Sequence, residues 1–126
     1  MQQKNENWMA QWTCPPAEWR RFNRWLLARK GLKGLLLFIP RLLLSVRPAE
    51  VKIGLEEVYI NKEYHLLRAP GLRLLQINIF EAGDMNIMEL RGGGKHRGYC
   101  IRIPVPRGKL KEAVMLEYRF RQLYAL

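Results

Sequence analysis

Residues 72–105 read LRLLQINIFEAGDMNIMELRGGGKHRGYCIRIPV, and apolar side chains recur at alternate positions through most of this stretch. Such alternation is typical of β-strands that bury one face. The tripeptides AGD (residues 82–84) and GGG (residues 92–94) interrupt it, as turns between strands do. The stretch therefore predicts three antiparallel strands, and Pro104 and Pro106 place the last of them at a sheet edge.

The same period extends upstream to Val51. The segments VYI (residues 58–60) and YHLL (residues 64–67) flank Asn61-Lys62-Glu63, a sequence typical of a hairpin turn. Residues 69–71, APG, indicate a further turn. The sequence thus predicts an antiparallel meander of five or six strands, and the apolar neighbours of three aromatic residues place them in its core: Tyr59, Tyr64 and Phe80.

Helical periodicity replaces the alternation on both sides of the meander. After Pro106, apolar residues share one helical stripe: Leu110, Ala113, Leu116, Phe120, Leu123 and Tyr124. Before the meander, Pro15 and Pro16 suit a first helical turn. An amphipathic helix is predicted from Pro16 to Lys30, with Trp19, Phe22, Trp25 and Leu26 on one face and Arg20, Arg21 and Arg24 on the other.

These elements predict the fold class α+β, with an N-terminal amphipathic helix, a bent antiparallel sheet and a C-terminal capping helix. Residues 1–12 are predicted as a polar arm, in which Trp8 and Trp12 are candidates for docking on the domain. Residues 13–126 form the single domain: residues 13–50 contain the helix and an apolar, basic connector, and residues 51–126 contain the sheet and the last helix. An OB-like barrel, with its helix inserted between strands, is the alternative fold.

The connector contains LLLFIPRLLLSV (residues 35–46), which is shorter than the about 20 apolar residues that a membrane-spanning helix needs. Extending it upstream would add Arg29, Lys30 and Lys33 to its own Arg41, and buried charges oppose insertion. Three interpretations remain open for this run: a buried helix kinked at Pro40, two short strands, or an element that lies in a membrane interface.

Composition argues against an enzyme. The 126 residues include one serine, one threonine and one aspartate, so few nucleophiles and acids are available. Gly92-Gly93-Gly94-Lys95 lacks the first glycine and the following Ser or Thr of a phosphate-binding loop. Cys14, Cys100, His65 and His96 lack metal-ligand spacing. We therefore expect no catalytic, cofactor-binding or metal-binding residues, and reduced thiols in a cytoplasmic protein without a signal peptide.

Charge is the informative feature, because 22 Lys and Arg against 11 Asp and Glu leave a net charge of +11. Two acid-free basic blocks lie between Glu18 and Glu50 and between Glu89 and Glu112. They predict an anionic partner, either a phospholipid surface or, as the alternative, nucleic acid. The expected membrane surface comprises Arg20, Arg21, Arg24, Arg29, Lys30, Lys33 and Arg41. The alternative nucleic-acid surface comprises Arg91, Lys95, His96, Arg97, Tyr99 and Arg102.

Tyr99 has two interpretations, because it either stacks on a base or continues the inward alternation of Ile101, Ile103 and Val105.

Three segments carry a resemblance to a known family: Trp19-Arg20-Arg21-Phe22 after Pro15-Pro16, the strand and turn from Ile53 to Asn61, and IRIPVPRGK (residues 101–109) before the last helix. Together they make the chain resemble bacterial pleckstrin-homology-like domains of the YcxB type. The resemblance implies a seven-stranded, bent antiparallel sheet capped by a C-terminal helix. It also implies a non-enzymatic, membrane-associated protein, often with a hydrophobic hairpin ahead of the sheet, and the short apolar run with Pro40 and Arg41 departs from that feature. We expect a protein that is peripheral at the inner face of the membrane, with anionic phospholipid or a membrane protein as its partner.

Overall fold

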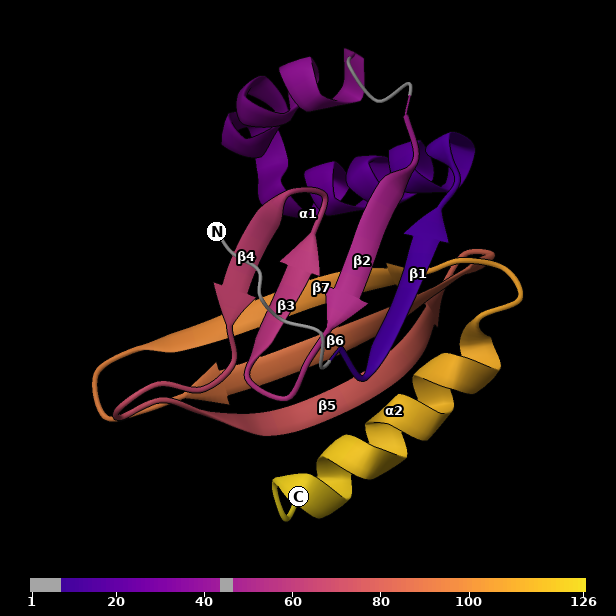
Figure 1. The fold of residues 1–126 in the computed structure, drawn as a ribbon. Helices are drawn as coiled ribbons and strands as arrows, with labels where there is room; N and C mark the ends of the chain where they lie inside the picture. Colours follow the sequence, from indigo (N-terminus) through magenta and orange to yellow (C-terminus); the bar gives the residue numbers. More distant parts are fainter. Residues whose placement is uncertain (1–7, 44–46) are drawn as a thin grey trace.

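Seven strands form two antiparallel sheets, which pack face to face with two helices at their margins (Figure 1). The computed structural model describes the backbone of residues 8–43 and 47–126, and the side chains of residues 8–29 and 47–126. The elements are β1 (Ala10–Cys14), α1 (Pro16–Leu43), β2 (Ala49–Ile53), β3 (Glu57–Ile60), β4 (Glu63–Leu66), β5 (Arg73–Ala82), β6 (Met85–Gly93), β7 (Gly98–Val105) and α2 (Leu110–Leu123). The α+β class, the N-terminal helix and the C-terminal helix are thereby confirmed, but the predicted end of the first helix at Lys30 is wrong, because α1 continues to Leu43.

The sheet itself differs from the predicted one. One sheet has the order β1-β2-β3-β4 and the other has the order β5-β6-β7, so two sheets replace a single bent one. Their strands cross at a steep angle in Figure 1. Because the ladders of the described strands do not run from one sheet into the other, the OB-like barrel is wrong.

β1 corrects the predicted domain boundary. Residues 1–12 were expected as a polar arm, but β1 pairs with β2 from Ala10 opposite Ile53 to Cys14 opposite Ala49. The boundary at residue 12 therefore falls inside a strand, and residues 1–7 lie outside the described part of the chain. Trp12 docks as expected, since its side chain points inward and is 4% exposed.

The β3–β4 hairpin confirms the predicted turn at Asn61. Asn61 and Lys62 both have positive φ angles, 47° and 75°, which is the requirement of a type I′ turn. Asparagine tolerates this conformation well, and the turn's twist matches that of the flanking strands. The two-residue loop places Tyr59 directly opposite Tyr64 across the ladder.

The core lies between the two sheets, where the inward alternate positions of their strands meet. Fully buried examples are Val51, Ile53 and Val58 from the first sheet and Ile77, Met88 and Ile103 from the second. α2 contacts both β5 and β1 and closes one side of the sandwich. Its buried residues are Ala113, Leu116 and Phe120, whereas Leu110 and Leu123 of the predicted stripe are exposed.

The three-stranded sheet is also covered on its outer face, at one end. Register and alternation place Phe80, Ile87 and Pro104 side by side on the face opposite the core. The ring of Trp25 lies 5.9 Å from that of Phe80, centroid to centroid, so α1 covers this apolar row. Both faces of the sheet therefore carry apolar side chains at this end.

Phe120→Ala is expected to destabilise the protein by about 3–5 kcal/mol, because it removes a fully buried ring and leaves a cavity under α2. Tyr118→Ala is the matched control, since Tyr118 lies on the same helix with 64% of its surface exposed. Urea unfolding followed by circular dichroism measures both free energies. Equal stability of the two variants would contradict the docking of α2 described above.

Candidate functional site

The first half of α1 uses its aromatic face to dock on the domain. Trp19 and Phe22 are 4% and 2% exposed, and their rings stack at a centroid distance of 5.7 Å. Phe22 in turn stacks on Trp25, which reaches Phe80 of β5. These rings are occupied by the protein itself, so Trp19 and Phe22 are unavailable for insertion into a membrane.

The predicted membrane surface is only partly present as a set of exposed cations. Arg24 and Arg29 are exposed, and Arg29 stacks over the ring of Trp25, with its guanidinium carbon 4.9 Å from the ring centroid. Arg21 is engaged, because its Nη1 donates to both carboxylate oxygens of Asp84, at 3.0 and 3.1 Å. Arg20 is half-buried. The side chains of Lys30, Lys33 and Arg41 lie outside the described residues.

The apolar run after Gly34 is helical. The backbone of α1 is helical from Pro16 to Leu43, so the interpretation of residues 35–43 as two short strands is wrong. The burial of this run, and residues 44–46, lie outside the described residues. Within the described chain, α1 and α2 lack the combination of length and apolar character that crossing a bilayer requires.

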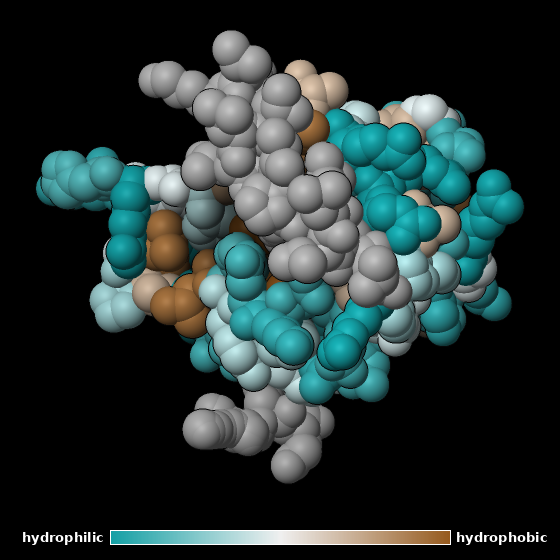
Figure 2. Space-filling model, turned by 90° about the horizontal axis from the view of Figure 1, so that it is seen from above, coloured by the Kyte–Doolittle hydropathy of each residue, from teal (hydrophilic) through white to brown (hydrophobic). Residues whose placement is uncertain are grey.

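The turn between β6 and β7 carries the most exposed residues of the predicted nucleic-acid surface. Lys95, His96 and Arg97 are all exposed, and the Gly94 N–H donates to the Arg97 carbonyl at 2.8 Å, which closes the turn. We call these three residues the basic tip. Figure 2 shows hydrophilic side chains projecting from this end of the molecule, at the left of the view, beside a hydrophobic patch.

Tyr99 is a structural residue, so its assignment to a base-stacking surface is wrong. Its hydroxyl donates to the Leu67 carbonyl at 2.8 Å, and its ring covers Gly92 so closely that a Cβ there would lie 2.1 Å from the ring. Burial, followed by the field of Tyr124, raises the pKa of Tyr99 to about 12. The inward alternation with Ile101 and Ile103 is the correct interpretation.

Arg91 and Arg102 share the single carboxylate of Glu89 on the outer face of the three-stranded sheet. The Nε atoms of Arg91 and Arg102 lie 3.0 and 2.9 Å from the two oxygens of Glu89. Partial burial acts to raise the pKa of Glu89, but hydrogen bonds from both arginines bring that pKa below its usual value. Of the six residues predicted for nucleic acid, the structure therefore brings together three as exposed polar side chains at one turn, those of the basic tip.

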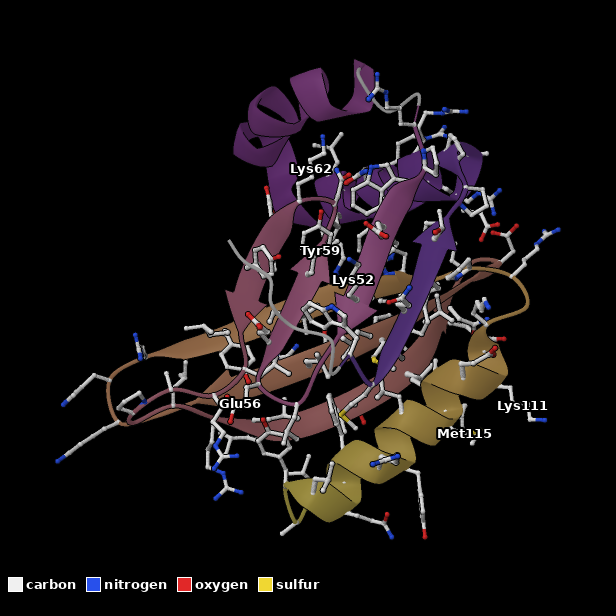
Figure 3. The ribbon with its side chains drawn as sticks, in the orientation of Figure 1. Lys52, Glu56, Tyr59, Lys62, Lys111 and Met115 are labelled. Carbon is white, nitrogen blue, oxygen red and sulfur yellow. The ribbon has the colours of Figure 1, made fainter. Side chains whose placement is uncertain are left out.

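An exposed aromatic row on the four-stranded sheet was missed. Gln11, Lys52, Tyr59 and Tyr64 lie opposite one another on β1 to β4, on the face away from the core. The two tyrosine rings meet edge to face at 4.9 Å, and the Lys52 ammonium lies 5.3 Å from the Tyr59 ring (Figure 3). Tyr64 is 60% exposed and Tyr59 shares its outward face, so the expected place of both tyrosines in the core is wrong. Register across four strands creates this row, and no single segment reveals it.

The cysteines are free thiols in contrasting surroundings. Cys14 is buried, its thiol lies 3.7 Å from the Pro104 carbonyl, and burial with the nearby Glu18 charge raises its pKa to about 12. Cys100 is exposed beside Glu89. The described residues contain no group of three or more His, Cys, Asp or Glu side chains that could hold a metal ion.

Glu89→Gln is expected to destabilise the fold by about 1–3 kcal/mol at neutral pH, because two charge-assisted hydrogen bonds lose their anion. The folded-state pKa of Glu89 is lowered, so its contribution is present above the unfolded pKa and is lost as pH falls through the folded pKa. The difference between wild type and variant should therefore shrink in acid. Glu81→Gln, at an exposed position on β5, is the control for thermal unfolding measured across pH.

An equal loss of stability in Glu89→Gln and Glu81→Gln would contradict the role of Glu89 as the shared anion. So would a stability difference between wild type and Glu89→Gln that persists at low pH.

The chain matches no family model, no curated protein and no solved structure.

Proposed function

We propose that the protein is a non-enzymatic interaction module that associates peripherally with an anionic membrane surface through α1. The observation that carries the proposal is the helical backbone of α1, which joins two exposed arginines to the run of apolar residues that begins at Leu35. The cations attract anionic headgroups, and the apolar turns enter the interface. The cytoplasmic face of the membrane, where anionic lipids supply the surface potential, is the corresponding location.

The two halves of α1 have different roles in this proposal. The first half is bound to the sheets through Trp19, Phe22 and Trp25, so it supports the rest of the helix. Residues 35–39 are all apolar, and a helix that is apolar on every side needs cover from protein or lipid. Figure 1 shows the later turns of α1 at the end of the molecule that carries the β3–β4 turn, away from α2.

We also propose that the domain is pleckstrin-homology-like, as the sequence resemblance implies. Seven antiparallel strands and a closing C-terminal helix support the resemblance in strand number, although the strands form two sheets. The chain departs from the resemblance ahead of β2, because such domains often carry a hydrophobic hairpin there, whereas here a single helix, α1, contains a short apolar run with Pro40 and Arg41. A membrane protein is the other expected partner.

Cosedimentation with vesicles tests the membrane proposal. We expect the protein to pellet with vesicles of phosphatidylglycerol and phosphatidylcholine, but to stay in the supernatant with phosphatidylcholine alone. The double variant Arg24→Gln/Arg29→Gln should weaken binding by about 2 kcal/mol, because each cation near such a surface contributes about 1 kcal/mol. The variant Leu36→Asp should weaken binding as well, by opposing insertion.

The control double variant, Lys111→Gln/Arg119→Gln, removes two exposed cations from α2 and should bind vesicles like the wild type, apart from a small effect of net charge. Equal recovery of the wild type with both vesicle types at low salt would overturn membrane association. Pelleting lost equally in both double variants would show that net charge, and not α1, is responsible.

The basic tip supports nucleic-acid binding as a second candidate function. Lys95, His96 and Arg97 are exposed and lie in a stretch without acidic residues between Glu89 and Glu112. Phosphate contacts from such residues give affinity that falls steeply with salt.

A mobility-shift titration across salt concentrations tests this second candidate. Arg97→Ala should lower the salt slope by about one unit, since it removes one phosphate contact. Arg102→Ala is the matched control and should change the slope less, because Arg102 is paired with Glu89 at 2.9 Å. Absence of binding to DNA and RNA at about 50 mM salt would eliminate this candidate.

A further inference from the structure

A groove of about 510 Å³ lies where the β4–β5 loop meets the β6–β7 hairpin. The two loops lie side by side at the left of Figure 1. Their contact is a backbone one, because a Cβ added to Gly94 would lie 1.7 Å from the Gly71 carbonyl oxygen. Gly71 has a φ of 75°, which favours glycine. Glycine at both positions therefore keeps the loops together and leaves the groove open.

A β-bulge supplies the apolar side of the groove. The register of β5 with β6 shifts between Leu74 and Gln76, which leaves Leu75 unpaired in the ladder. Leu74 is fully buried, whereas Leu75 is 55% exposed and lines the groove with Leu72. Bulges commonly re-aim a side chain near binding sites. Here the bulge turns a leucine out of the core and into a hollow surface.

Two arginines supply the polar side. Arg68 and Arg73 line the groove, and the residues that line it include no acidic side chain. Arg73 donates one hydrogen bond to the Tyr124 carbonyl at 3.0 Å, and the Arg68 Nη1 lies 3.9 Å from a carboxylate oxygen of Glu56. Each guanidinium has five N–H donors, so both retain donors after these contacts. The adjacent basic tip adds to the positive potential at this end of the molecule.

We propose that this groove binds one anionic amphiphile, a phosphate or carboxylate head group with a short alkyl chain. The guanidinium groups of Arg68 and Arg73 receive the head group through charge-assisted hydrogen bonds. Leu72 and Leu75 contact the alkyl chain, whose burial favours binding. The site is separate from α1, so the inference does not depend on membrane association through that helix.

Nuclear magnetic resonance titration with octyl phosphate, below its micelle concentration, tests the proposal. We expect saturable shifts of the backbone amides of residues 68–75 and 93–94, with smaller shifts for inorganic phosphate and for octyl glucoside. Arg68→Gln should weaken binding about tenfold, which is the effect of one charge-assisted hydrogen bond. Leu75→Gln should weaken it about fivefold through lost apolar contact.

Met115→Gln is the control for Leu75→Gln, because Met115 is 60% exposed on α2 and points away from the domain (Figure 3). Arg24→Gln/Arg29→Gln should bind octyl phosphate like the wild type, so failure of the membrane proposal and failure of this one are distinguishable. Arg73→Gln loses a contact with Tyr124 that supports the fold, and for this reason Arg68→Gln is the primary variant.

Vesicles that contain phosphatidic acid distinguish the source of the ligand. If Arg68→Gln weakens both octyl phosphate binding and pelleting, the head group of a bilayer lipid occupies the groove; if it weakens octyl phosphate binding alone, a free amphiphile does. Equal affinity for inorganic and octyl phosphate would overturn the amphiphile assignment. Equal shifts with octyl glucoside, or octyl phosphate affinity unchanged in both Arg68→Gln and Leu75→Gln, would overturn the site itself.

Discussion

Trp12 joins the two sheets, and its contact fixes where α1 begins. Its indole Nε1–H donates to the Pro104 carbonyl at 3.0 Å, so the outer strand of one sheet, β1, is attached to the outer strand of the other, β7. Four residues later the chain enters α1. The helix must therefore begin beside β7, which brings Trp25 to Phe80 and covers the outer apolar row of the three-stranded sheet. A proline carbonyl at a sheet edge suits this contact, because its lone pairs face away from the ladder.

Local patterns predicted the elements that bury one face. The alternation in residues 72–105 predicted three strands, and the stripe with Leu116 and Phe120 predicted α2 and its docking face. Asn61 predicted a hairpin turn because asparagine tolerates positive φ angles. β1 was missed, because AQWTC is a short segment after a polar stretch and acquires its strand form by pairing with β2, far along the chain. Five residues show too little alternation of apolar and polar side chains to predict a strand that depends on long-range pairing.

The candidate site was predicted less well, since charge counts do not show which charges are paired. Arg21, Arg91 and Arg102 all entered the predicted surfaces, yet Asp84 and Glu89 hold them in ion pairs. Asp84 lies 63 positions from Arg21, so spacing along the chain gave no indication of that pair. The groove at the β4–β5 loop was missed for the same reason, because its two sides come from separate loops and its leucine is turned outward by a bulge.

The two thiols differ enough to make the protein convenient for labelling. Cys14 is buried with a pKa of about 12, so it forms little thiolate near neutral pH. Cys100 is exposed on the polar end of the outer face of the three-stranded sheet, although partial desolvation of its thiol raises its pKa as well. A maleimide dye under mildly alkaline conditions will therefore attach at Cys100, without any cysteine being introduced or removed. Fluorescence from that position reports on the strand next to the basic tip while the core stays unmodified.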